Sequence, residues 1–251
     1  MGLWDRAHGK ERDPHIPPSS GGTQAGGGAN GKTPEEYLKE WKRWTGHSPA
    51  KRRARAVESF GNAAECIGPI TEGMSLFAIT RGQWSMIDAI LHILHEVGPS
   101  KISFWTWTVA EYEIQVVDRL RRDGNITAGR MIIDYGARNK NAQLIRQWKD
   151  TFGEDSVRYV VNHAKIATIE SESGLRLLAR GSMNLNFNPR FEQFDLTEGG
   201  PDFDLVRRIE DELPILPDDC TGPQAFVASK AGQAFDAETL KIFTRPKVWE
   251  K

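Results

Sequence analysis

The amino-acid sequence predicts an α/β fold, a mixed and mostly parallel β-sheet flanked by helices on both faces. Two observations indicate this class. Between residues 74 and 152, short apolar runs alternate with segments whose apolar residues recur every three or four positions, the pattern of strands alternating with helices around a largely parallel sheet. From residue 157 onward the apolar runs follow one another directly, which favours consecutive strands. The 251 residues suffice for one domain with its own core and less ordered ends.

The first 60 residues divide into two parts. Residues 1–32 are rich in Gly, Pro and Ser, have little to bury and are expected to form a disordered tail. Residues 33–60 combine a helix start at Thr33-Pro34, an apolar stripe ending at Trp41 and Trp44, and a basic run at 51–55. Two interpretations stay open: the stripe docks on the main folded domain or on a partner subunit, or this segment is a nucleic-acid arm.

The main folded domain is expected over residues 61–215, with its first strand near Met74. Alternating strands and helices are predicted in the order 74–80, 81–97, 102–108, 109–122, 130–135 and 139–152. Ligands of such sheets bind beyond the carboxyl ends of the strands, so Thr108 and Asp134 are candidates for the rim of a site. Asp134 is equally interpreted as the cap of a turn before Gly136.

On the predicted helix 81–97, Asp88, His92 and His95 share one flank. This spacing suits a metal in principle, but we interpret the three as solvated helix-surface residues. No metal and no cofactor are therefore expected.

Four strands in succession are predicted over 157–161, 164–170, 175–179 and 193–196, followed by a helix at 203–213. Residues 216–251 are expected to form a C-terminal loop and a short helix near residues 237–243. Neither carries residues that suggest chemistry.

The composition indicates in which cellular compartment the protein is expected. Two cysteines without metal or disulfide spacing favour a reducing compartment, and no run approaches the length of a membrane span. A cytoplasmic protein without stable membrane association is expected. Residues 1–60 carry 11 Lys and Arg against 7 Asp and Glu, whereas residues 191–251 carry 7 against 13, so the front of the chain is basic and the back is acidic.

The chemistry is concentrated between residues 163 and 192. His163 and Lys165 stand two apart in an alternating run, so on a strand both project from one face. Glu170 ends that run. A second apolar run leads to Gly181, Ser182 and Asn184, where a turn brings a hydroxyl and an amide together, and Glu192 follows. These residue types suit an anionic phosphate.

This pattern, H-x-K-x4-acid followed by G-S-x-N and a later acid, resembles the signature of the phospholipase D superfamily. Two features depart from it: Glu170 stands where the family usually has Asp, and ten residues rather than about six separate it from Gly181. The resemblance covers residues 74 to 215 and implies a phospholipase D-like α/β/α sandwich. It also implies a metal-independent phosphodiesterase, a hydrolase that acts through a phosphohistidine.

The resemblance implies a role for each residue. His163 attacks phosphorus, Lys165 and Asn184 hold the non-bridging oxygens, and Ser182 donates a hydrogen bond in the same network. Glu192 is expected to hold the far nitrogen of His163. Glu170 completes the set of six with no defined task.

The family's mechanism uses two histidines, yet the complete motif occurs once in this chain. A homodimer with its two-fold axis through the active site is therefore expected. Nucleic acid is the favoured substrate, which makes the protein a nuclease, in particular an endonuclease. Two alternatives stay open: phospholipid hydrolysis or phosphatidyl transfer, with an apolar rim at Phe104, Trp105 and Trp107 unless these lie in the core, and an inactive nucleic-acid-binding or assembly protein that keeps the fold.

Overall fold

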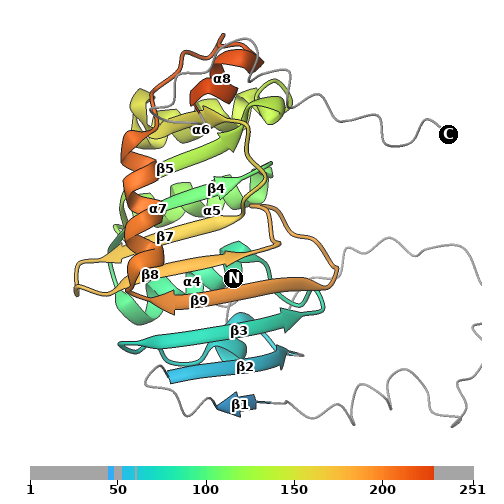
Figure 1. The fold of residues 1–251 in the computed structure, drawn as a ribbon, viewed down its shortest axis with the longest axis vertical. Coiled ribbons are helices and arrows are strands. Elements are labelled where there is room, and N and C mark those ends of the chain that lie inside the picture. The colour runs from blue at the N-terminus through green and yellow to red at the C-terminus, as the bar shows by residue number, and fades with distance from the viewer. Residues whose placement is uncertain (1–44, 48–52, 60, 229–251) are drawn as a thin grey trace, which may run out of the picture.

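The computed structural model describes residues 45–47, 53–59 and 61–228 (Figure 1). Predictions for the tail, for the Trp-bearing segment up to residue 44 and for the short helix near residues 237–243 lie outside these ranges. Within them nine strands form one sheet in the order β1-β2-β3-β9-β8-β7-β4-β5-β6. Their bounds are β1 Thr45–His47, β2 Arg53–Ser59, β3 Met74–Thr80, β4 Ser100–Thr106, β5 Ile126–Asp134, β6 Val157–Val160, β7 Ile166–Ser171, β8 Arg176–Gly181 and β9 Glu192–Glu198.

Helices cover the sheet on both faces, which confirms the predicted α/β class. The helices are α3 Ala63–Ile67, α4 Met86–Val97, α5 Glu111–Arg122, α6 Ala142–Phe152, α7 Pro201–Glu212 and α8 Gly222–Ala228, with 3-10 turns at Tyr135–Ala137 and Glu154–Ser156. In Figure 1, α4 and α5 lie behind the strands, whereas α7 crosses in front of them. No helix in the described part of the chain is both long enough and apolar enough to cross a membrane.

Strand direction changes in the middle of the sheet. The pairs β2–β3, β4–β5 and β5–β6 are parallel, while β7, β8 and β9 pair antiparallel with one another and with their outer neighbours β4 and β3. The sheet is therefore mixed as predicted, but its centre is antiparallel. The physical reason is that β7, β8 and β9 are joined without crossover helices, and only antiparallel strands can be joined in this way.

The sheet begins earlier in the chain than residue 61. All seven residues of β2 pair in parallel with β3, so the segment interpreted as a basic arm includes a strand of the domain. The guanidinium of Arg55 donates hydrogen bonds to the carbonyl oxygens of Cys66 and Ile67. This arginine therefore anchors β2 to α3 through one guanidinium nitrogen.

Helix α4 is buried along most of its length, and this corrects the interpretation of its polar residues. Asp88 and His92 are buried: the Asp88 carboxylate accepts a 2.8 Å hydrogen bond from the Ser85 backbone N–H, and His92 Nε2 lies 2.7 Å from the carbonyl oxygen of Gly68. The expectation of a solvated surface was wrong because Asp88 is the acid of a capping box. The contact of His92 is with a loop that is distant in sequence, which the helix pattern alone does not reveal. Only His95 is exposed. No group of three or more metal-ligating side chains occurs among the described residues.

Candidate active site

Two half-motifs meet where β7 begins and β8 ends. The N–H of Gly181 donates a 3.0 Å hydrogen bond to the carbonyl oxygen of Lys165, so the hairpin sets the H-x-K and G-S-x-N segments side by side. A Cβ atom on Gly181 would lie 2.1 Å from the carbonyl oxygen of Gln193. Only glycine fits here because β9 passes too closely for a side chain.

Lys165 is a buried cation at the start of this hairpin, with 7% of its surface exposed. Its ammonium donates a 2.7 Å hydrogen bond to the carbonyl oxygen of His163. Burial lowers the pKa of Lys165, and the carboxylate of Glu192 opposes that shift. A cation held in this way is suited to receive an anion that replaces its lost hydration.

Ser182 and Glu192 form a second cluster of contacts beside Lys165. The Ser182 hydroxyl donates a hydrogen bond to the Glu192 carboxylate and accepts one of 2.9 Å from the Gln193 N–H. The Asn188 amide donates to the same carboxylate at 3.3 Å. Sequence reasoning missed Asn188. The hydroxyl is thus fixed in direction by Glu192 and Gln193, and Asn188 holds the Glu192 carboxylate.

Glu192 does not hold the far nitrogen of His163 in this structure. Its carboxylate is engaged by Ser182 and Asn188, and no hydrogen bond joins it to the His163 ring in the described part of the chain. This corrects the expected role: within one subunit Glu192 orients Ser182 and supports the charge of Lys165.

Asn184 and His163 are connected through Trp107. The side-chain oxygen of Asn184 accepts a 3.2 Å hydrogen bond from the Trp107 backbone N–H, which orients the amide. The Trp107 indole lies against the imidazole of His163, with ring centroids 6.4 Å apart. The structure therefore brings His163, Lys165, Ser182, Asn184 and Glu192 together at one end of the sheet.

The loop that carries His163 is held by a network that the sequence had only partly indicated. Asp134, at the end of β5, accepts 2.8 Å hydrogen bonds from the N–H groups of Gly136 and Asn162. Asn162 in turn donates to the carbonyl oxygen of Thr106 at 3.2 Å and accepts from the Ala164 N–H at 2.8 Å. Asp134 is therefore both the predicted turn cap and a positioning residue for His163. Asn162 was missed because nothing in its local sequence marks it.

Glu170 lies away from this cluster. It pairs across the hairpin with Arg176 at the end remote from Gly181, and its carboxylate forms a 2.7 Å ion pair with Arg207 of α7. It lies five positions along the chain from Lys165, roughly 16 Å at 3.3 Å per residue. The structure thus does not bring Glu170 to the phosphate-binding residues, and the long spacer extends the hairpin away from them.

Aromatic side chains are exposed around the candidate active site. Trp107 is 47% exposed, Phe187 40% and Phe191 66%. Phe104 is buried, as the core interpretation required, and the Trp105 indole N–H donates to the buried Glu210 at 2.7 Å. The core interpretation is wrong for Trp107, which lies at the surface because β4 ends one residue before it.

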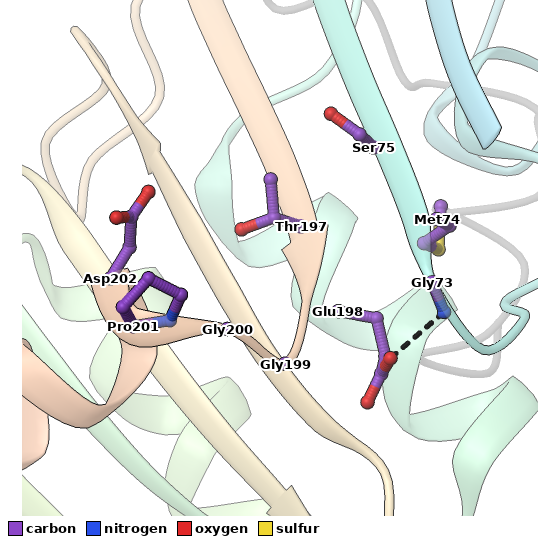
Figure 2. A pocket seen from close by; sticks show the side chains of 9 residues that line it. All are labelled: Gly73, Met74, Ser75, Thr197, Glu198, Gly199, Gly200, Pro201 and Asp202. Carbon is purple, nitrogen blue, oxygen red and sulfur yellow. Dashed lines mark hydrogen bonds between the residues drawn. The ribbon is translucent and has the colours of Figure 1, made fainter. Parts of the chain in front are cut away.

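A cavity of about 150 Å³ lies at the other end of the sheet, between the start of β3 and the end of β9. Figure 2 shows its lining, with the Glu198 carboxylate accepting a 2.8 Å hydrogen bond from the Gly73 N–H. Its charged lining residues, Glu198 and Asp202, are acidic. This cavity is therefore unsuited to phosphate and separate from the His163 cluster.

No protein-family profile matches the chain, and no curated protein matches it. Among solved structures, polyphosphate kinase from Porphyromonas gingivalis is similar with 15% identity over 59% of this chain and 27% of that chain, at a TM-score of 0.42. Nuc from Salmonella typhimurium, a phospholipase D family member, is similar with 13% identity over 55% of this chain and 91% of that chain, at a TM-score of 0.35. The match thus spans about a quarter of the kinase. Similarities this weak assign no function, and the chemistry rests on the residues of this chain.

Proposed function

We propose that this protein is a metal-independent phosphodiesterase of the phospholipase D type that cleaves nucleic acid through a phosphohistidine on His163. The observation that carries the proposal is the convergence of Lys165, Ser182 and Asn184 beside an exposed imidazole. The ammonium of Lys165 and the oriented amide of Asn184 are donors that suit the oxygens of a phosphodiester. The Ser182 hydroxyl donates to Glu192 and so holds that carboxylate beside them.

Phosphodiesters resist nucleophiles because their oxygens are negatively charged, so the enzyme must neutralise that charge. Lys165 supplies a cation whose hydration is already lost to burial. The Asn184 oxygen is engaged by Trp107, which leaves its amide N–H groups as donors for the substrate. Together they polarise phosphorus in front of His163.

The reaction proceeds in two displacements. An imidazole nitrogen of His163 attacks phosphorus, the bond from phosphorus to the leaving oxygen breaks, and a second histidine gives that oxygen a proton. The same second histidine then takes a proton from water as the water attacks phosphorus and the bond to His163 breaks. The products are two shorter strands, one of which carries the terminal phosphate.

The second histidine comes from a second copy of the chain. Of the other histidines with described side chains, His92 is buried against Gly68, and His95 lies on α4. A two-fold axis through the site supplies the missing group from the partner's copy of the same motif. The active enzyme is therefore a homodimer with one shared active site.

The test uses the purified full chain in EDTA with supercoiled plasmid, single-stranded DNA, RNA and labelled phosphatidylcholine. Cleavage of nucleic acid by the parent and its loss in His163→Ala are expected, because the covalent route needs the imidazole. His95→Ala is the matched control and keeps parent activity.

Three outcomes would contradict parts of this proposal. Turnover of phosphatidylcholine alone would replace the nuclease by a phospholipase. Cleavage by His163→Ala within tenfold of the parent would defeat the role of His163. Light scattering that detects an active monomer would defeat the shared site.

A further inference from the structure

We propose that the substrate is single-stranded nucleic acid, with Trp107 and Phe191 stacking the unpaired bases on either side of the cleaved phosphate. This inference rests on the proposed function and specifies its substrate class. It comes from the arrangement of exposed aromatic rings around the phosphate-binding residues.

Trp107 provides the first ring. It immediately follows β4, its backbone N–H is bonded to Asn184, and its indole lies 6.4 Å from the His163 ring. With 47% of its surface exposed, the indole presents a face to solvent beside both the nucleophile and the oriented amide. A base next to the bound phosphate can stack there.

Phe191 provides the second ring on the other side of the cluster. It directly precedes Glu192 and is 66% exposed. The guanidinium of Arg81 lies 5.1 Å from the centroid of its ring and forms a 3.0 Å ion pair with Glu58. Arg81 therefore supports one face of the ring through a cation–π contact.

The loop that carries Phe191 is fixed against the loop after β3. A Cβ atom on Gly82 would lie 2.5 Å from the Cα of Pro189, so the two backbones are in close contact. The Asn188 amide bonds to Glu192 in the same loop. The ring is thus presented by a supported segment, as a binding surface requires.

Base pairing determines whether exposed aromatic rings can bind a single strand or a duplex. In a duplex the faces of the bases are stacked on one another, so exposed rings have nothing to stack against, whereas unpaired bases offer both faces. Rings on both sides of the phosphate-binding residues therefore favour an unpaired strand over a duplex.

The sequence around these rings disfavours a membrane. Phe187 and Phe191 are separated by Asn188, Pro189 and Arg190, so aromatic, amide and cationic side chains interleave. A surface that inserts into lipid needs a contiguous apolar face. Interleaved aromatic and basic residues are typical of surfaces that bind single strands.

The experiment measures binding separately from cleavage. Trp107→Ala and Phe191→Ala are made in the full-length His163→Ala protein, which is not expected to cleave. Fluorescence anisotropy then gives Kd for a labelled single strand, for the duplex of the same sequence and for a single strand whose central nucleotides lack bases. Phe77→Ala is the matched control, because Phe77 is 42% exposed in the middle of β3.

We expect the His163→Ala protein to bind the single strand at least about tenfold more tightly than the duplex. Each aromatic substitution should weaken single-strand binding by about 5- to 150-fold, the range measured for loss of one stacking ring. Binding to the base-free strand should change by less than about twofold, and Phe77→Ala should leave every Kd unchanged.

Three results would overturn the inference. The first is equal affinity for single strand and duplex, and the second is conversion of the variants to monomers in light scattering, which would make these rings a contact between copies. The third comes from a parallel binding assay with phosphatidylcholine vesicles: variants that lose vesicle binding and keep single-strand binding. Cleavage by the parent is assayed in parallel. Ring-dependent single-strand binding without cleavage would reject the proposed function and leave a single-strand binding site formed by the two rings. Cleavage without ring dependence would keep the proposed function and reject the role of the rings.

Discussion

The ammonium of Lys165 donates a 2.7 Å hydrogen bond to the main-chain carbonyl oxygen of His163, two residues earlier. Cation and nucleophile are thereby held in one short segment whose backbone is tied to β5 through Asn162 and Asp134. Because the carbonyl is neutral, the buried charge remains available to an anion. The arrangement is that of an anion site formed before the substrate arrives.

Replacing Lys165 with Met should lower kcat/KM for nucleic acid by about 10²- to 10³-fold, since one preorganised charge is lost from the transition state. Stability should not fall, because burial already lowers the pKa of this lysine and its charged form is therefore penalised by folding. Steady-state kinetics and urea unfolding measure the two effects. Lys101→Met, on an exposed lysine of β4, is the control, and activity of Lys165→Met within threefold of the parent would contradict the assignment.

Substitution of the two candidate acids, Glu192 and Glu170, should affect activity to different extents. Glu192→Gln removes the charge that raises the pKa of Lys165 and alters the partner of Ser182, so activity should fall by about 10- to 100-fold. Glu170→Gln loses an ion pair with Arg207 and should leave kcat/KM within about twofold. Equal losses in the two variants, at equal thermal stability, would restore Glu170 to the active site.

Gly181→Ala should destabilise the protein by about 1–3 kcal/mol or prevent folding, because the new methyl group meets the carbonyl oxygen of Gln193. In any folded fraction, the displaced β9 should also misplace Ser182 and reduce activity. Thermal unfolding and activity per folded molecule measure the effects. Parent stability and parent activity in this variant would show that β9 is not held as closely as the structure places it.

Asp218 should make the free energy of unfolding depend on pH in the acidic range, where its carboxyl becomes protonated. Burial raises its pKa, but hydrogen bonds from Lys149 and from the Tyr159 hydroxyl, 2.8 Å away, hold the pKa below its usual value of 3.8. A carboxyl with a lowered pKa in the folded state stabilises above its unfolded pKa, and this contribution is lost as pH falls through the folded pKa. Urea unfolding should therefore show the parent more stable than Asp218→Asn at pH 7. The difference should vanish below the folded pKa, and one that persists unchanged there would contradict this account.

Mixed dimers test whether two subunits share one active site. If both imidazoles are needed, a dimer with one His163→Ala subunit is inactive, and activity falls as the square of the parent fraction. An equal mixture after subunit exchange should then keep about a quarter of the parent activity. Independent sites would keep about half, and that linear dependence would refute the shared site.

The sequence predicted the elements better than their pairing. Apolar runs and helical periodicity located β3 to β9 and α4 to α7 because those signals are local. The strand β2 was missed because Arg53 and Arg55 were interpreted as part of a basic run that could bind nucleic acid, although charged and apolar residues alternate along it. That β9 lies between β3 and β8 depends on contacts far apart in sequence, which no local pattern carries.

The candidate site was predicted where the chemistry is local and missed where it is tertiary. His163, Lys165, Ser182 and Asn184 follow from one spacing pattern. The partner of Glu192 is Ser182 rather than His163, a choice set by how β8 and β9 pair. Trp107 reached the surface because its strand ends at Thr106, and the alternating apolar pattern gave no sign of that end.

The most direct test of the central claim is to trap the covalent intermediate during turnover of an end-labelled single strand, with an alkaline denaturing quench that preserves phosphohistidine. Mass spectrometry should find the oligonucleotide attached to His163, at no more than one adduct per dimer, because the two imidazoles share one phosphate. Continued cleavage with no adduct on His163, or with the adduct on another residue, would contradict the account.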